Sequence, residues 1–354
     1  MKALIGMSGG VDSSVAALLT RQAGFECVGA TMRLYSPDGS KNCGGLTDVE
    51  DARSVAQRLG IEHLVLDFQE EFREKVMDAF AASYLNGTTP NPCIQCNRHL
   101  KFGAMLSRAR ELGCEYVVSG HYARISRDEA TGRYLLRRAA DPAKDQTYFL
   151  YCLSQEQLAS IRFPLGELTK AQVRQIAEEA GFVNARKHDS QDICFVPDGD
   201  HTRFLAQHTG KAFDQGDFLD LEGNRVGQHR GAACYTIGQR KGLGIALGAP
   251  VYVCGKDMEK NTVTVGPNEA LFSRELLAND WFWFPFPALT EPMKVTAKIR
   301  HSQFDKAATV YPEENGYARV VFDEPQRAIS PGQAVVLYSG EIVIGGGTIT
   351  KAVF

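Results

Sequence analysis

The chain has 354 residues, of which 39 are lysine or arginine and 42 are aspartate or glutamate, so its formal charge is −3. This balance excludes a protein that holds nucleic acid by bulk positive charge alone. Hydrophobic residues make up 44% of the chain, which excludes a disordered protein. At this length we expect roughly two to three domains.

Alternating apolar and amphipathic segments fill the first half of the chain. Strands are expected at residues 3–7, 27–32, 63–67 and 116–119. Helices are expected at residues 11–22, 47–59, 70–85, 97–112 and 169–180. Strands that alternate with helices of this length indicate a parallel α/β sheet.

The pattern changes after about residue 200, where helical periodicity becomes rare. Glycine-rich turns there separate short β-like runs at residues 251–253, 263–265, 295–299, 318–322 and 334–337. The aromatic and proline-rich segment 281–287 indicates a domain boundary nearby. We therefore expect two smaller β-rich units, the last of them a barrel or a sandwich.

The chain contains nine cysteines, which is an odd number. We expect a reducing, cytoplasmic setting, because no apolar export segment follows Met1 and no run of about 18 apolar residues predicts a membrane span. In that setting cysteines are buried, catalytic or metal-binding, and structural disulfides are rare.

The segment Ser8–Ser14, with the sequence SGGVDSS, lies between the first expected strand and the first expected helix. Consecutive glycines let the backbone approach an anion, and a helix N-terminus offers N–H groups to it. No lysine follows the glycines, so this is not a Walker A loop, and Asp12 is available for a magnesium ion. The segment resembles the loop of the ATP pyrophosphatases, which split ATP into AMP and pyrophosphate while adenylating a substrate oxygen.

Two further positions are expected near a nucleotide, because ligands bind at the carboxyl ends of parallel strands. Met32 ends the second expected strand, and the segment 119–121 follows the fourth. For Met32, core packing is the alternative that position alone favours.

Two cysteines lie in the segment Asn91–Asn97, with the sequence NPCIQCN. We expect Asn97 to begin a helix, which would place Cys96 at a helix N-terminus, where a thiolate is favoured. Cys93 and Cys96 also have the spacing of half a zinc site, but no second close pair of ligands accompanies them. A thioredoxin-like dithiol, and a catalytic thiol that works with a distant cysteine, are the other interpretations.

Cys194 is the distant partner that we expect for such a thiol. It lies in the segment Ser190–Phe195, with the sequence SQDICF, among polar residues that suit a loop near a site. A cysteine without a partner in a motif is more often a buried residue that serves core packing. The remaining cysteines have no motif and are expected to serve packing: Cys27, Cys43, Cys114, Cys152, Cys234 and Cys254.

Together these segments resemble the tRNA-specific 2-thiouridylases. The matching stretches are SGGVDSS, NPCIQCN, SGHYAR at 119–124, KDQTYFL at 144–150, SQDICF, YTIGQRKGLG at 235–244 and SPGQAVVLY at 330–338. They span nearly the whole chain in the same order. The resemblance implies an adenine nucleotide alpha hydrolase-like ATP pyrophosphatase domain with a parallel sheet over residues 1–199, a small central β-rich domain over 200–270 and a C-terminal β-barrel over 271–354.

The resemblance also implies the reaction, which replaces O2 of the wobble uridine (position 34) of certain tRNAs with sulfur. ATP, with Mg²⁺, would adenylate that oxygen and release pyrophosphate and then AMP. Cys194 would carry a persulfide supplied by a sulfur carrier or a cysteine desulfurase. Cys96 would be the nucleophile that helps to release the sulfur, through a transient Cys96–Cys194 disulfide. No resident metal, membrane or DNA partner is implied.

Binding residues follow from the same match. The nucleotide would be bound by Gly6, Met7, Ser8, Gly9, Gly10, Val11, Asp12, Ser13, Met32 and Gly120. The tRNA would be contacted by Asn91, Pro92, Cys93, His121, Lys144, Asp145, Gln146, Arg300, His301 and Gln333. Many relatives have aspartate where this chain has Cys93, so an acid–base role at this position stays open.

Because the net charge is slightly negative, RNA contact must come from local basic patches. Candidates are residues 98–101, 144–146 and 240–241. In the last unit, Lys294, Lys298 and Arg300 alternate with apolar residues, and a period of two places them on one face of a strand. A solvated polar face is the alternative there. An anticodon loop suits such a protein, since flipping a loop nucleotide costs only a few kcal/mol.

Two rival functions remain open on the sequence alone. One is another ATP pyrophosphatase, such as an amide-forming synthetase that acts on a small molecule; the β-rich second half and the cysteines speak against it. The other is a non-catalytic RNA-binding or zinc-binding protein, which leaves the phosphate loop unexplained.

Overall fold

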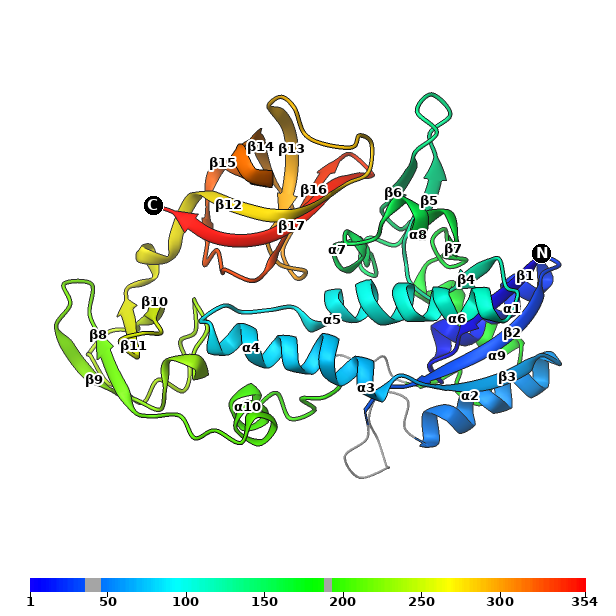
Figure 1. Cartoon of the computed structure of the whole chain (residues 1–354), viewed down its shortest axis with the longest axis horizontal. Coiled ribbons are helices and arrows are strands. Elements are labelled where there is room, and N and C mark those ends of the chain that lie inside the picture. The colour runs from blue at the N-terminus through cyan, green and yellow to red at the C-terminus, as the bar shows by residue number, and fades with distance from the viewer. Residues whose placement is uncertain (36–45, 188–192) are drawn as a thin grey trace.

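The computed structural model describes residues 1–35, 46–187 and 193–354. Figure 1 shows a sheet domain with its covering helices, a barrel beside it and a small sheet unit below the barrel, with two long helices crossing the middle. Cys43 and residues 190–192, which the sequence analysis singled out, lie outside the described residues. Within the described ranges, no helix is both long and apolar enough to span a membrane.

A five-stranded parallel sheet forms the first domain, in the order β3-β2-β1-β4-β7. Its strands are β1 (Lys2–Gly6), β2 (Glu26–Arg33), β3 (Glu62–Asp67), β4 (Tyr116–Val118) and β7 (Ile161–Arg162). The strand order reverses between β1 and β4, and the loops that follow those two strands flank this switch point, where ligands bind in such sheets. The predicted parallel sheet is therefore confirmed.

Helices cover both faces of this sheet. They are α1 (Val11–Gln22), α2 (Leu46–Leu59), α3 (Gln69–Phe72), η1 (Arg73–Asp78), α4 (Ala79–Leu85), α5 (Pro92–Gln95), η2 (Cys96–Ala104), α6 (Met105–Glu111) and α9 (Lys170–Glu179). Ala3 and Ile5 of β1 share a core with α1, α2 and α9, whereas Leu4 faces the core formed with the other helices. This alternation follows from the period of two in a strand.

The helix expected at 97–112 begins one turn earlier, at Pro92. Asn91 caps it, since its side-chain oxygen accepts a hydrogen bond from the N–H of Cys93 at 3.2 Å. Pro92 occupies the first helical position, where its fixed φ and its missing N–H are favourable. The prediction that Asn97 begins the helix is wrong, because the proline-rich approach is a helix start rather than a loop.

Residues 124–159 form four elements that the sequence pattern did not predict: β5 (Arg124–Arg127), β6 (Tyr134–Arg137), α7 (Thr147–Leu150) and α8 (Gln155–Ala159). β5 and β6 form a hairpin, and β6 pairs with β17 of the barrel at Arg137 and Ile342. The hairpin thus joins the first domain to the barrel sheet. Its short strands are only partly apolar, which is why no strand pattern stood out.

The central unit contains α10 (His201–Thr209), β8 (Gly216–Leu219), β9 (Arg225–His229), η3 (Ala232–Cys234), β10 (Tyr252–Asp257), β11 (Thr262–Gly266) and η4 (Asn268–Leu271). Its sheet has the order β10-β11-β8-β9. Phe218, Val253 and Val263 are fully buried in its core. This small β-rich unit matches the expectation.

The last unit is a barrel, formed by β12 (Phe272–Trp283), β13 (Met293–Lys298), β14 (Lys306–Pro312), β15 (Ala318–Arg327), β16 (Ala334–Ser339) and β17 (Ile342–Val353), with η5 (Glu314–Gly316) between β14 and β15. Its strands run β12-β15-β14-β13-β16-β17, and pairing of β12 with β17 closes it. Val295, Ala297 and Ile299 are buried while Lys294 is exposed, so the predicted alternation is confirmed. The aromatic segment 281–287 lies inside the barrel unit, because Trp281–Trp283 complete the closing strand, which begins at Phe272.

Candidate functional site

The glycine loop after β1 lies at the switch point of the parallel sheet, with α1 beginning directly after it. Gly9 has φ +71°, and a Cβ there would lie 2.4 Å from the carbonyl oxygen of Asp48. Gly10 is the N-cap of α1 and provides no side-chain cap. The first N–H groups of α1 therefore remain available to an anion.

Gly120 lies against the same loop from the end of β4. A Cβ at Gly120 would lie 2.7 Å from the carbonyl carbon of Asp12 and 2.8 Å from the nitrogen of Ser13. Only glycine permits this approach of two backbones. The structure therefore brings together the predicted nucleotide residues of the first loop and Gly120.

Two lysines reach this loop from distant parts of the chain, although none follows the glycines in sequence. Lys170 Nζ donates to both carboxylate oxygens of Asp12, at 2.7 and 2.8 Å, and Tyr122 Oη donates to Asp12 at 2.8 Å. Lys187 Nζ lies 3.3 Å from the carbonyl oxygen of Gly9. These contacts place two ammonium groups at the loop.

Acidic residues hold Lys187 in place. Its Nζ donates to Asp48 at 2.8 Å and to Asp51 at 2.7 Å. Partial burial favours the neutral amine, but the hydrogen bonds to the two carboxylates outweigh burial and raise the pKa of Lys187. The side chain is therefore a cation at neutral pH.

The remaining predicted nucleotide residues surround the loop. Gly6 and Met7 lead into it from β1, and Val11 is the first residue of α1. Met32 is partly buried near the end of β2 and packs on the core shared with Cys96. The anion-binding groups fit a nucleotide phosphate: backbone N–H groups, hydroxyls of Ser8 and Ser13 joined at 3.3 Å, and the two lysines.

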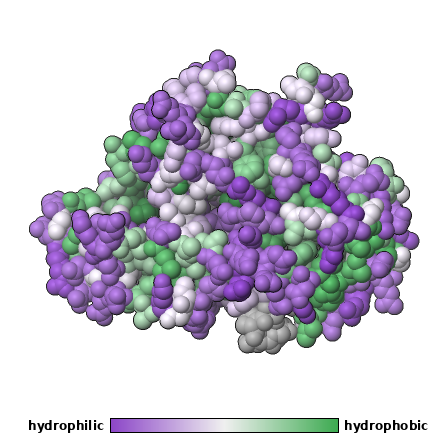
Figure 2. Space-filling view, in the orientation of Figure 1, coloured by the Kyte–Doolittle hydropathy of each residue, from purple (hydrophilic) through white to green (hydrophobic). Residues whose placement is uncertain are grey.

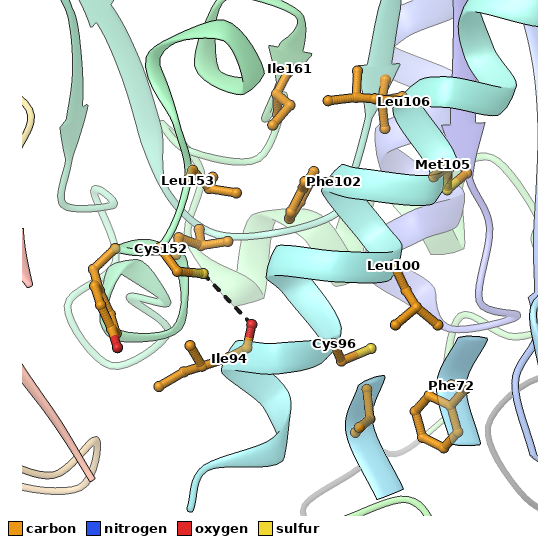
Figure 3. Packing of buried hydrophobic residues seen from close by; sticks show 14 of the residues in the cluster. Phe72, Ile94, Cys96, Leu100, Phe102, Met105, Leu106, Cys152, Leu153 and Ile161 are labelled. Carbon is orange, nitrogen blue, oxygen red and sulfur yellow. Dashed lines mark hydrogen bonds between the residues drawn. The ribbon is translucent and has the colours of Figure 1, made fainter. Parts of the chain in front are cut away.

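The two cysteines of the NPCIQCN segment differ in exposure. Cys93 is exposed in the first turn of the helix, and Cys96 is buried one turn further on, with 8% of its surface exposed. In Figure 3 the Cys96 side chain points towards Phe72 of the neighbouring helix, whereas Cys152 lies on the other flank of the helix.

Cys194 packs against the same apolar cluster as Cys96. The ring of the next residue, Phe195, makes an edge contact with Phe72 at 5.7 Å between ring centres. Phe72 therefore lies on the side to which Cys96 points (Figure 3) and contacts the residue that follows Cys194. The structure places Cys96 and Cys194 around one cluster, and no disulfide joins them.

Cys152 is a contrasting thiol that predicts a reactivity order. It is fully buried, its sulfur donates to the carbonyl oxygen of Ile94 at 3.6 Å, and burial raises its pKa to about 12. At pH 8 it therefore stays protonated, and only the thiolate is nucleophilic. In native protein treated with iodoacetamide, peptide mass spectrometry should show Cys93 modified and Cys152 intact. Modification of both at equal rates before unfolding in urea would contradict this.

Several predicted tRNA residues have internal contacts. His121 is buried between the rings of Phe102 and Phe163, and burial, followed by the charge of Lys101, lowers its pKa well below the usual value. Asp145 is buried and accepts from the N–H of Ala139 at 3.0 Å. Both side chains are therefore enclosed by the protein rather than presented to solvent.

Residues on either side of Asp145 are more accessible. Lys144 and Gln146 are partly exposed, and Gln146 accepts from the N–H of Tyr122 at 2.9 Å. This contact links the segment 144–146 to the tyrosine that holds Asp12.

The predicted tRNA residues of the barrel unit lie towards the segment that leads into the cysteine helix, which is the helix that begins at Pro92 and carries Cys93 and Cys96. Gln333 Nε2 donates to the carbonyl oxygen of Thr89 at 3.0 Å, and the N–H of Thr89 donates to Pro331 at 2.8 Å. His301 is exposed and its ring lies 4.4 Å from that of Phe149. Arg300 is partly buried and donates to the carbonyl oxygen of Ala328 at 2.9 Å.

Arg98, which was expected in a basic RNA patch, serves a different purpose. Its guanidinium donates to Asp280 of the barrel at 2.6 Å and lies 4.8 Å from the centre of the Phe282 ring. The pairing neutralises its charge, so residues 98–101 are a weaker basic patch than their sequence indicates. No sequence pattern linked Arg98 to a residue 182 positions away.

Comparisons with known proteins agree with this architecture. A family model described as tRNA methyl transferase HUP domain matches residues 1–198, one described as tRNA methyl transferase PRC-barrel domain matches residues 202–267, and one described as Aminomethyltransferase beta-barrel domain matches residues 273–349. The tRNA-specific 2-thiouridylase MnmA of Clostridioides difficile is 49% identical over 99% of this chain and 98% of its own length. The protein of the same name from Acetivibrio thermocellus is 50% identical over 98% of this chain and 99% of its own length. The chain belongs to the tRNA-specific 2-thiouridylase family.

Proposed function

We propose that this protein is an ATP-dependent sulfurtransferase that converts the wobble uridine of tRNA to 2-thiouridine. The observation that carries the proposal is the pairing of two sites in one domain: an anion-binding loop with two lysines, and two thiols around one apolar cluster. Full-length relatives named tRNA-specific 2-thiouridylase support this reading.

The first step makes an oxygen into a leaving group. Uracil O2 attacks the α-phosphorus of ATP, the bond to the β-phosphate oxygen breaks, and pyrophosphate leaves. The N–H groups of the first turn of α1, together with Lys170 and Lys187, would stabilise the charge on the phosphates. Asp12 is the carboxylate that would face a magnesium ion arriving with ATP, and such an ion would neutralise pyrophosphate charge.

The second step transfers sulfur. The terminal sulfur of a Cys194 persulfide attacks C2 of the adenylated uracil, and AMP leaves. The Cys96 thiolate then attacks Sγ of Cys194, breaks the S–S bond, releases 2-thiouridine and forms a Cys96–Cys194 disulfide. A thiol reductant restores both cysteines, and a persulfide-bearing carrier protein reloads Cys194. Such chemistry suits the reducing cytoplasm.

The tRNA would enter between the barrel and the first domain. The exposed Cys93 and the partly exposed Lys144, Gln146 and Gln333 lie on elements that meet there, and Figure 2 shows hydrophilic residues gathered along the middle of this face. The buried Asp145 and His121 would then support the contacting residues from behind. We expect the barrel and the hairpin β5–β6, which pair through β6 and β17, to hold this surface in place before the tRNA binds.

The test is nucleoside analysis of unmodified tRNA incubated with the protein, ATP and a persulfide donor. We expect 2-thiouridine only when ATP is present, with AMP and pyrophosphate formed in proportion. Pyrophosphate release that is independent of tRNA but requires a small carboxylic acid would favour an amide-forming synthetase instead. Cells that lack the protein should contain tRNA without wobble 2-thiouridine.

A further inference from the structure

The helix that carries Cys96 is not a regular α-helix. Its middle, η2, is π-helical from Cys96 to Ala104, and the N–H of Met105 bonds to the carbonyl oxygen of Leu100, five residues earlier. A wide turn inserts one residue relative to the α-helical register, which rotates one end of the helix by about 100° relative to the other. The register of η2 therefore decides which side of the helix Cys96 faces.

One side chain from a separate helix contacts the carbonyl groups of this wide turn. Gln157 Nε2 donates to the carbonyl oxygen of Phe102 at 2.7 Å and lies 3.5 Å from that of Arg98. The Gln157 amide therefore adds hydrogen bonds from outside the helix to carbonyl oxygens of the wide turn, in addition to the backbone bonds of a π-helix.

The same glutamine is held by its own helix. Its Oε1 accepts from the N–H of Ser154 at 2.8 Å, and the N–H of Gln157 donates to Ser154 Oγ at 3.1 Å, so the two residues form the capping box of α8. The box fixes the amide with its oxygen towards Ser154 and its NH₂ group towards η2. Two further contacts restrain η2: Asn97 Nδ2 donates to Phe149 at 3.0 Å, and Arg98 pairs with Asp280.

We propose that Gln157 is a positioning residue for the sulfur-transfer step: it holds η2 in its wide register and thereby keeps Cys96 directed towards Phe72 (Figure 3), whose ring contacts Phe195, the residue that follows Cys194. This inference rests on the proposed function for its catalytic meaning. The positioning itself is a property of the helix and can be measured without tRNA.

The test is Gln157→Glu, because a carboxylate still accepts from the N–H of Ser154 but donates nothing to η2. We expect alkylation of Cys96 in the free protein, measured against Cys93 in the same sample, to become about tenfold slower. We expect kcat for 2-thiouridine formation to fall about 10²-fold, with KM for ATP and for tRNA within about twofold of the original values. Gln157→Met, which is neutral and also donates nothing, should change both rates in the same direction.

The matched control is Gln172→Glu in the capping box of α9, where Gln172 Oε1 accepts from the N–H of Thr169 at 2.8 Å and the side chain faces solvent. It should leave both readouts unchanged. A lower unfolding temperature in Gln157→Glu with unchanged Cys96 alkylation and kcat would reduce Gln157 to a stabilising residue and overturn the proposal. An effect of Gln157→Glu that Gln157→Met lacks would assign it to charge and overturn the proposal as well. If the unsubstituted protein makes no 2-thiouridine, the proposed function fails while the alkylation comparison still decides the role of Gln157.

Discussion

Replacing Cys194 by serine is expected to abolish 2-thiouridine formation while leaving one round of pyrophosphate release per enzyme intact. A serine hydroxyl cannot carry a persulfide, so no sulfur nucleophile is available to attack the adenylated tRNA. The nucleotide loop contains none of the thiols, so adenylation does not depend on Cys194. Loss of a covalent catalytic group lowers such rates by about 10³-fold or more. Nucleoside mass spectrometry and a pyrophosphate assay on the same reaction measure the two steps separately.

The partner change, Cys96→Ser, should stop the reaction one step later. The sulfur would already join Cys194 to C2 of the uridine, and no thiolate would remain to break the S–S bond. A covalent adduct of protein and tRNA should therefore accumulate in non-reducing gels and disappear with dithiothreitol, whereas Cys194→Ser should give none.

Cys254→Ser is the matched control for both cysteine variants, because Cys254 is partly buried in the central sheet and belongs to no motif. It should retain full activity. Full activity in Cys96→Ser and Cys194→Ser together would contradict the proposed chemistry, and an adduct in Cys194→Ser would assign the persulfide to another cysteine.

Lys170→Met should slow the ATP-dependent adenylation step strongly and leave the chemistry at the cysteines unchanged. The change deletes the ammonium group that contacts both oxygens of Asp12, so the carboxylate, to which Tyr122 Oη still donates, lies beside the phosphates without that positive charge. Removing a preorganised charge from such a site costs about 10²–10³-fold in kcat. Pyrophosphate release should fall by that factor, and persulfide loading of Cys194 from a carrier should be unchanged.

Two comparisons show whether that loss comes from the site. Lys170→Arg keeps the charge and should retain more activity than Lys170→Met, although the guanidinium geometry differs. Lys260→Met removes an exposed lysine that pairs with Asp257 at 3.6 Å in the central unit, and it should leave pyrophosphate release unchanged. Normal pyrophosphate release in Lys170→Met would show that the lysine only neutralises Asp12.

Much of the architecture was predictable because its signals are local. The apolar runs of β1 to β4 and the periodicity of α1 identify a parallel sheet, and the bounds predicted for α1 agree with the structure. The end of the cysteine helix was predictable within a residue but its start was not, since prolines in an N-cap segment resemble a loop. The hairpin β5–β6 was missed because its strands are short and only partly apolar, so they carry no strand pattern of their own.

The sequence by itself determined the sheet and the glycine loop, because each depends on residues that are neighbours along the chain, and it made Cys96 and Cys194 the candidate thiols through resemblance to a family. Only the tertiary structure decided which distant side chains complete them. Lys170 reaches Asp12 across 158 positions, Asp280 pairs with Arg98 across 182, and Gln157 donates to the carbonyl oxygen of Phe102 in the wide turn that follows Cys96. The physical reason is that hydrogen bonds and ion pairs depend on distance in space, and local sequence patterns carry no signal for contacts formed when separate elements pack together.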